Sequence, residues 1–193
     1  WRRFPWPWRS RHVGCAVVWP PSGRARPTGA DRPERLGWGR FTLGVGAASR
    51  RHTEDVLGLS WDKPFSYTRE FIEALEPLLA GEPADTDGEQ LSAHTQLAID
   101  ARPTPILLAA LGPRMLRFSG ARLQGTSLGQ CGPRTISSYI LPHLQAGAEK
   151  AGRGGNLRVM ALVRICVTDD VAGAKALARE ISAQYQANPS YAN

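Results

Sequence analysis

The chain has 193 residues, of which 42% are hydrophobic and 21% charged, the composition of an ordinary globular protein. This length allows one domain or slightly more, at roughly 100 to 200 residues per domain. No apolar run approaches the roughly 18 residues that a spanning helix needs, so we expect no membrane partner.

The net charge of +7 comes from the first forty residues. They contain nine arginines against Asp31 and Glu34, which accounts for the whole excess and leaves residues 41–193 neutral overall. A neutral body has no general phosphate-binding face. We therefore expect no nucleic-acid partner, and a nucleic-acid-binding module acting through the basic leader stays open only as an alternative.

Residues 1–38 are predicted to be a disordered or out-of-frame leader. The first 39 residues hold five of the six tryptophans and six of the fifteen prolines, and these prolines interrupt every candidate helix or strand. Enrichment in Arg, Pro, Gly, Ala and Trp is typical of a GC-rich gene read in a wrong frame. The apolar run Cys15–Trp19 is too short for a secretory signal, and no cleavage site follows it.

From Arg40 onward the pattern predicts strands and helices in alternation. Residues 41–46 form a short apolar strand that ends in glycines. Pro64 then opens a helix whose apolar residues recur every three or four positions until Gly81 stops it. Residues 82–103 are polar and rich in Gly, Asp and Pro, and are predicted to be a long irregular excursion.

Three further strand and helix pairs follow, at 105–110 then 114–120, at 121–128 then from Pro133, and at 157–167 then from Val171. The first of these strands is apolar on both faces, as in a parallel strand covered by helices. Thr168 or Asp169 is expected to cap the last helix. Four successive strand-then-helix units predict a parallel sheet in an α/β fold.

Four units amount to about half of an eight-unit barrel, which takes roughly 250 residues. A doubly wound open sheet also fits the length, but residues 41–46 do not run through a glycine fingerprint directly into a helix. We therefore predict an α/β fold that is a partial TIM-like (β/α)8 barrel of about four β/α units. Such a sheet keeps two open edges, so some of these strand residues should be exposed: Leu43, Val45, Leu107, Val159, Leu162 and Ile165.

The cysteines and histidines give no sign of a metal. Cys15, Cys131 and Cys166 are odd in number and far apart, which predicts neither a disulfide framework nor a zinc site. Unpaired cysteines suit a reducing cytoplasm, where we expect the protein to be. The four histidines show no ligand spacing, and we predict no metal.

Six segments resemble one family in the same order along the chain: Gly39-Arg-Phe-Thr-Leu-Gly-Val-Gly46, Gly58-Leu-Ser-Trp-Asp-Lys-Pro64, Tyr67-Thr-Arg-Glu-Phe-Ile-Glu-Ala-Leu75, Pro105-Ile-Leu-Leu-Ala-Ala-Leu-Gly-Pro113, Gly132-Pro-Arg-Thr135 and Cys166-Val-Thr-Asp-Asp170. They are similar to the luciferase-like monooxygenase superfamily, and most similar to its branch of oxidoreductases that depend on the deazaflavin coenzyme F420. The resemblance covers residues 39–193, which we take as the domain.

The resemblance implies a barrel of which this chain holds about the fourth to seventh units. It also implies hydride transfer between F420, or alternatively FMN, and a small organic substrate, in proteins that are commonly homo-oligomeric. The cofactor-binding residues that it implies are Gly44, Gly46, Ser49, Ala109, Ala110, Gly112 and Pro113. Small residues let backbone N–H groups approach an anion, and the helix start at Gly112-Pro113 offers its positive end.

The resemblance also implies acid–base residues near Ser49, where relatives often carry a histidine. His52 and Glu54 lie close by in this sequence and are the candidate catalytic residues, because an imidazole or a carboxylate can move a proton.

The chain departs from the family within residues 121–131, so it stays open whether residues 1–38 and 121–131 are in frame. Thr126 and Cys131 are therefore not assigned to the site, and Cys131 is expected to be a small buried residue. The function we expect is an F420-dependent oxidoreductase, inactive as these 193 residues. An FMN-dependent luciferase-like monooxygenase and a non-functional truncated or frameshifted gene product are the alternatives.

Overall fold

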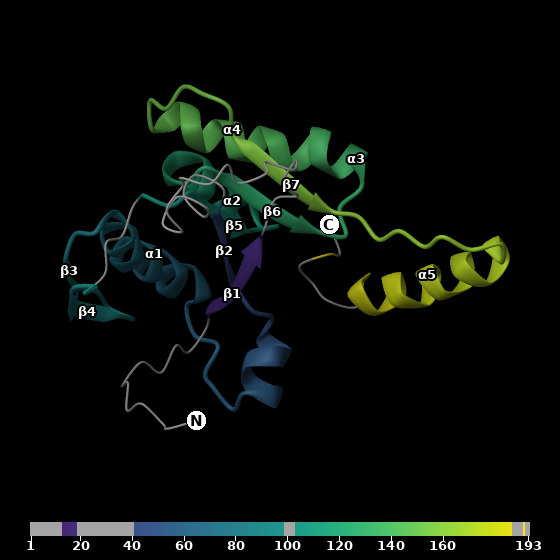
Figure 1. Cartoon of the computed structure of the whole chain (residues 1–193), viewed down its shortest axis with the longest axis horizontal. Helices are drawn as coiled ribbons and strands as arrows, with labels where there is room; N and C mark the ends of the chain where they lie inside the picture. Colours follow the sequence, from purple (N-terminus) through teal and green to yellow (C-terminus); the bar gives the residue numbers. More distant parts are fainter. Residues whose placement is uncertain (1–12, 19–40, 99–102, 187–190, 192–193) are drawn as a thin grey trace, which may run out of the picture. The chain divides into compact units, whose positions relative to one another are not determined.

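The computed structural model describes residues 13–18, 41–98, 103–186 and 191. They belong to two compact units, Trp1–Pro105 and Ile106–Asn193. The first unit contains β1 (Val13–Val18), β2 (Thr42–Ala47), a π-helical turn (His52–Val56), α1 (Pro64–Ala80), β3 (Ala84–Asp87) and β4 (Ser92–Thr95) (Figure 1). The second contains β5 (Ile106–Ala109), α2 (Pro113–Arg122), β6 (Gly125–Gly129), α3 (Pro133–Thr135), a π-helical segment (Ile136–Ile140), α4 (Leu141–Lys150), β7 (Arg158–Leu162) and α5 (Val171–Gln186).

Strand β1 lies within the stretch where no strand was expected. It pairs antiparallel with β2, from Val13 opposite Ala47 to Val18 opposite Thr42. The expectation was wrong for these six residues because their run is uncharged and rich in valine, and pairing with β2 gives their backbone groups hydrogen-bond partners. The rest of the predicted leader lies outside the described residues.

Helix α1 begins and ends where the sequence predicts. Pro64 occupies its first turn, where a missing N–H costs nothing. Gly81 ends the helix with φ at 85°, a left-handed conformation that glycine adopts without strain, and its N–H donates to the carbonyl of Leu78. The buried face of the helix includes Ile72 and Leu78.

Strands β3 and β4 form an antiparallel hairpin within residues predicted to be irregular. Ala84 and Ala93 of the hairpin are buried against Ala74 and Leu78 of α1. The two strands have only four residues each, and an alanine is the single apolar residue in each, so the local pattern shows no apolar alternation typical of a strand. Packing on α1 is what makes this segment regular, and local propensity does not reveal it.

A buried carboxylate holds the turn of this hairpin against α1. Glu70 is only 5% exposed, and its Oε2 accepts hydrogen bonds from the N–H groups of Gln90 (2.6 Å) and Leu91 (2.9 Å). Arg69 donates to its other oxygen at 3.3 Å. A Cβ atom on Gly88 would lie within 3 Å of the Glu70 carboxylate, so the turn requires a glycine there.

Strands β5, β6 and β7 of the second unit are parallel, and helices connect them. Leu107 pairs with Gly125 and Gly129 with Leu162. Gly125 is required because its φ is 143° and a Cβ atom would lie 1.8 Å from the carbonyl oxygen of Arg158. The predicted α/β class with four strand-then-helix units (β2 and α1, β5 and α2, β6 and α3–α4, β7 and α5) is confirmed.

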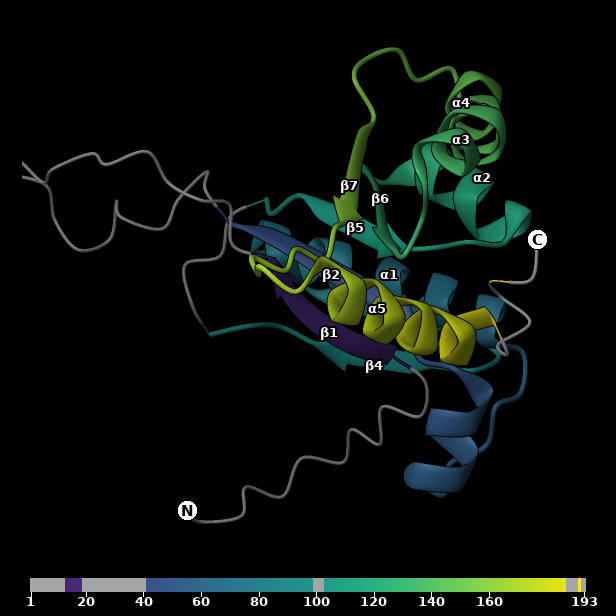
Figure 2. The ribbon, with the colours of Figure 1, turned by 90° about the vertical axis from the view of Figure 1, so that its right-hand side faces the viewer.

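Helices α2 and α4 cross closely on one side of this sheet (Figure 2). A Cβ atom on Gly120 would lie 1.8 Å from the carbonyl oxygen of Leu144, and one on Gly147 would lie 2.0 Å from that of Arg117. Glycine at both positions therefore lets the two backbones approach.

Strand β7 is shorter than the predicted strand at 157–167. It ends at Leu162 because that residue pairs with Gly129, the last residue of its neighbour β6. Every residue from Ala161 to Asp170 is exposed. The segment after Leu162 has no strand to pair with among the described residues of this unit.

The exposure predicted for an incomplete barrel is confirmed at two of the six strand residues. Leu162 is 60% exposed and Ile165 is 84% exposed, whereas Val45 and Leu107 are each 1% exposed. The exposed residues lie at and beyond the end of β7, and the buried ones lie within β2 and β5.

Helix α5 is capped by Asp170 rather than by Thr168 or Asp169. The Asp170 carboxylate accepts a hydrogen bond from the N–H of Gly173 at 2.8 Å, and Thr168 Oγ1 accepts one from the N–H of Asp170 at 3.1 Å. In the part of the chain that the structure describes, no helix is both long enough and apolar enough to cross a membrane.

The crossing of α2 and α4 can be tested by adding one methyl group. We expect Gly147→Ala to lower the free energy of unfolding by about 1–3 kcal/mol, because the backbone of Arg117 has to shift. Urea denaturation measures the loss. Gly154→Ala is the control, since a Cβ atom there meets nothing within 4 Å, and equal midpoints for the two variants would contradict the close crossing.

Candidate cofactor site

Two neighbouring parallel strands, β5 and β6, are each followed by a Gly-Pro pair that starts a helix. Gly112 precedes α2 and Gly132 precedes α3, both with extended backbones and without a hydrogen bond from a capping side chain. The carboxyl ends of parallel strands meet at one edge of the sheet, where α/β proteins bind ligands. The first backbone N–H groups of α2 therefore point their partial positive charge toward that edge.

The surface around Gly112 is open. A Cβ atom on this residue would meet nothing within 4 Å, and Pro113 and Ala109 are also exposed. Ala110 is buried instead. The structure thus brings four predicted cofactor-binding residues together on one strand-to-helix connection and leaves the backbone at Gly112 accessible to a ligand.

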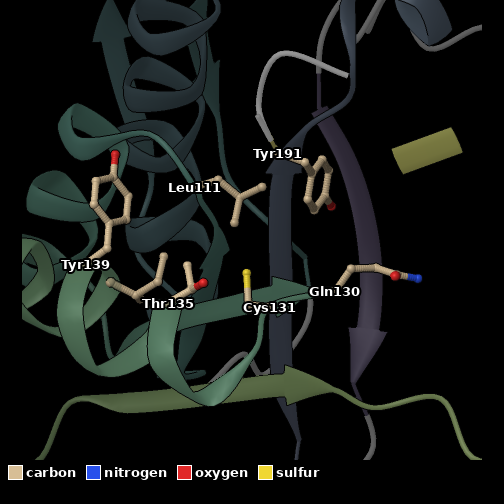
Figure 3. Close-up of a pocket in the computed structure, with 7 residues that line it drawn as sticks. Leu111, Gln130, Cys131, Thr135, Tyr139 and Tyr191 are labelled. Carbon is tan, nitrogen blue, oxygen red and sulfur yellow. The ribbon is translucent and has the colours of Figure 1, made fainter. Parts of the chain in front are cut away.

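A small pocket lies beside this connection, lined by Leu111, Gln130, Cys131, Thr135, Tyr139, Ile140 and Tyr191. Figure 3 shows labelled side chains from the residues after β5 and after β6, from the helical run that starts at Pro133, and from Tyr191, which lies beyond α5 near the C-terminus. The pocket volume is about 70 Å³, well below the roughly 300–1,000 Å³ of a typical ligand pocket. It can hold the end of a ligand but not a three-ring system.

Cys131 lines the pocket and is not the fully buried residue that was expected. It is partly exposed, and its thiol donates to the carbonyl of Gly129 at 3.6 Å. Partial burial raises the pKa of the Cys131 thiol. Burial first, and then the neighbouring Cys131 and Tyr185, raise the pKa of the Tyr191 hydroxyl. Both groups therefore remain neutral over a wider pH range than they would in water.

The other pocket residues were not predicted to belong to the site. One sequence feature could have pointed to them: a second Gly-Pro pair at Gly132, which follows the next strand just as the pair at Gly112 follows β5. Side chains such as Tyr139 and Gln130 carry no motif, and they reach the pocket only because α3 starts beside the end of β5.

The stretch that departs from the family makes specific contacts in the second unit. Gln124 accepts a hydrogen bond through Oε1 from the N–H of Ile106 at 2.7 Å. Thr126 is fully buried, and its hydroxyl donates to the carbonyl of Leu108 at 2.7 Å. Thr126 thus ties β6 to β5.

The remaining predicted residues lie in the first unit, at and after the end of β2. Gly44 and Gly46 are buried in the strand. Ser49 and His52 are exposed, and Ser49 Oγ accepts a hydrogen bond from the backbone N–H of His52 at 3.2 Å. Glu54 follows on the same π-helical turn and pairs with Arg50 at 3.7 Å.

His52 and Glu54 thus lie on one exposed π-helical turn, and Ser49 lies just before it. Their roles in binding and catalysis stay a prediction. Within the described ranges, no group of three or more His, Cys, Asp or Glu side chains is arranged to hold a metal ion.

The second unit consists of strand-then-helix units, and the backbone is accessible at the carboxyl ends of its parallel strands. These features define an α/β protein of the kind that binds a ligand at that edge of the sheet. The family model for luciferase-like monooxygenases matches residues 34–193. The chain belongs to this family, and the match begins slightly before the predicted domain start at Gly39.

Two curated relatives within this family share part of the sequence. The chain is 33% identical over 147 residues to a 5,10-methylenetetrahydromethanopterin reductase of Methanolobus tindarius, covering 75% of this chain and 44% of the relative. It is 29% identical over 116 residues to the reductase of the same name from Archaeoglobus fulgidus, covering 60% and 34%. The chain therefore spans less than half the length of the curated relatives it matches.

Among solved structures, the chain is similar to the coenzyme F420 dependent tetrahydromethanopterin reductase from Methanopyrus kandleri. The TM-score is 0.57 at 25% identity, over 68% of this chain and 43% of the other. The predicted resemblance to the F420-dependent branch of the family is confirmed.

The partial burial of Cys131 predicts a difference in thiol reactivity. Only the thiolate is nucleophilic, and a raised pKa keeps the thiol protonated to higher pH. At about pH 8 we expect iodoacetamide to modify Cys131 more slowly than the exposed Cys166, as peptide mass spectrometry would show. Cys166→Ser should leave the rate at Cys131 unchanged, and faster reaction at Cys131 would contradict its partial burial.

Proposed function

We propose that the chain binds coenzyme F420 and serves hydride transfer between the deazaflavin ring and a small organic substrate. The observation that carries the proposal is the helix start at Gly112, at the end of β5, which has no side-chain cap and where a Cβ atom on Gly112 would meet nothing within 4 Å. The similarity to the Methanopyrus kandleri reductase, an F420-dependent protein, supports the choice of cofactor.

The residues present fit the phosphate-bearing tail of F420. A phosphate at the start of α2 would accept hydrogen bonds from the first-turn N–H groups and interact favourably with the helix dipole. Glycine at position 112 leaves room for this approach, which any side chain would obstruct. The adjacent pocket is too small for the ring, so the ring has to lie outside it.

The ring carbon of bound F420 supplies the site that accepts or releases the hydride, and the protein orients the reactants around it. In this proposal the His52 imidazole and the Glu54 carboxylate donate or accept the substrate proton. Ser49, whose hydroxyl accepts a hydrogen bond from the backbone N–H of His52, is proposed together with Gly44 and Gly46 to bind the cofactor.

We also propose that these 193 residues bind the cofactor tail without catalysing turnover. The chain spans 44% of the length of the Methanolobus relative, and apolar residues at and beyond the end of β7 are exposed. Oxidation of reduced F420 with 5,10-methylenetetrahydromethanopterin as acceptor, followed by the visible absorbance of the coenzyme, tests this. We expect no turnover under conditions in which F420 binds, and measurable turnover would overturn the proposed inactivity.

Binding at Gly112 is tested by the variant Gly112→Val. We expect affinity for F420, measured by titration of its fluorescence, to fall by about tenfold or more, because hydrogen bonds to a charged group are lost. The backbone of Gly112 is extended and its surroundings are open, so the side chain introduces no clash within the protein.

Gly154→Val is the matched control, since this exposed glycine also has nothing within 4 Å of a Cβ atom, and it should leave F420 affinity unchanged. Thermal unfolding of both variants separates loss of binding from loss of structure. Equal affinity in Gly112→Val would remove this residue from the site. Tighter binding of FMN than of F420 would favour the FMN-dependent monooxygenase instead.

A further inference from the structure

The outer face of the β3–β4 hairpin carries a histidine between two carboxylates. Asp85 lies directly opposite His94 in the antiparallel register. Asp87 lies two residues along β3, on the same face. The His94 ring is 2.6 Å from Asp85 through Nδ1 and 3.0 Å from Asp87 through Nε2, so each ring nitrogen has its own carboxylate partner.

This geometry favours one protonation state of the His94 imidazole. An ionised carboxylate only accepts hydrogen bonds, and a neutral imidazole has only one N–H. Both short contacts can be hydrogen bonds at once only when the ring carries a proton on each nitrogen. We propose that the hairpin carries a pH-dependent clasp, in which protonated His94 bridges Asp85 and Asp87 and loss of its proton releases the outer face of the hairpin.

Several other charged groups near the hairpin are engaged elsewhere. At the turn, Glu89 pairs with Lys63. On the opposite face of the hairpin, Glu70 of α1 accepts from the turn amides, and Arg69 pairs with Glu70 and Glu73.

The two aspartates therefore dominate the environment of the His94 ring. Hydrogen bonds to Asp85 and then to Asp87, with the charge of Asp87, raise the pKa of His94 above its ordinary value of 6.5, and slight desolvation opposes them. A raised folded-state pKa means that the clasp stabilises the hairpin fully below pH 6.5, for as long as both carboxylates are ionised. Its contribution is lost as the pH rises through the higher folded-state value.

The clasp adds to contacts that do not depend on this proton. Ala84 and Ala93 stay packed against α1, and the Glu70 carboxylate holds the turn. Release of His94 therefore loosens the two short strands locally without unfolding the unit. The natural readouts are the titration of His94 and the hydrogen exchange of the hairpin amides.

The first experiment is an NMR titration of the His94 ring protons in the full chain, assigned by their absence in His94→Gln. We expect a pKa above 6.5, lowered in both Asp85→Asn and Asp87→Asn. The shift should be larger in Asp85→Asn, where the shorter hydrogen bond is lost. A value at or below 6.5 in the unmodified chain would overturn the clasp, and that measurement needs no variant to fold.

The second experiment compares amide hydrogen exchange in β3 and β4 between the unmodified chain and His94→Gln across the same pH range. Below pH 6.5 we expect exchange to be slower in the unmodified chain by roughly threefold, as suits an exposed charged pair. The ratio should fall to one above the pKa of His94. His143→Gln, a change in α4, should keep the unmodified pattern, and a ratio of one at every pH for His94→Gln would show that no clasp exists.

Discussion

The candidate site depends on the close crossing of α2 and α4. Gly120 and Gly147 let the two helices touch through their backbones, and α4 continues the helical run that starts at Pro133. A side chain at either glycine would push the helices apart and move their starting residues with them. The two Gly-Pro starts therefore lie beside the ends of β5 and β6 because the helices behind them are packed at a fixed, short distance.

Buried polar groups also fix how neighbouring segments of each unit align with one another. Glu70 satisfies two amides of the hairpin turn, and Thr126 and Ser119 donate to the backbone carbonyls of Leu108 and Gly125 in the sheet. Each of these groups would be costly to bury alone, so each demands one register of the segments it joins. Arg153 plays a similar part by donating to the carbonyls of Gly120 and Leu123, at the end of α2.

The parts of the fold that sequence predicts well are those with local chemical signals. Pro64 and Gly81 mark the ends of α1, and the uniform apolar run at 105–110 marks β5. The π-helical turn at His52 and the hairpin after α1 were missed because neither has a periodic pattern of its own. For the site, small residues at Gly112 could be found from a family resemblance, whereas Tyr139 and Gln130 enter the pocket through packing between segments far apart in the chain.

The sequence by itself determined the α/β class, the order of the four strand-then-helix units after Arg40, and the family, because apolar periodicity, helix-ending residues and motif order are written locally. Only the tertiary structure decided where β7 ends, since a strand lasts as long as its neighbour offers backbone partners and β6 stops at Gly129. It also decided that Val13–Val18 pairs with β2, that Cys131 lines a pocket, and that His94 lies between two aspartates. These features depend on contacts between segments, which no local pattern records.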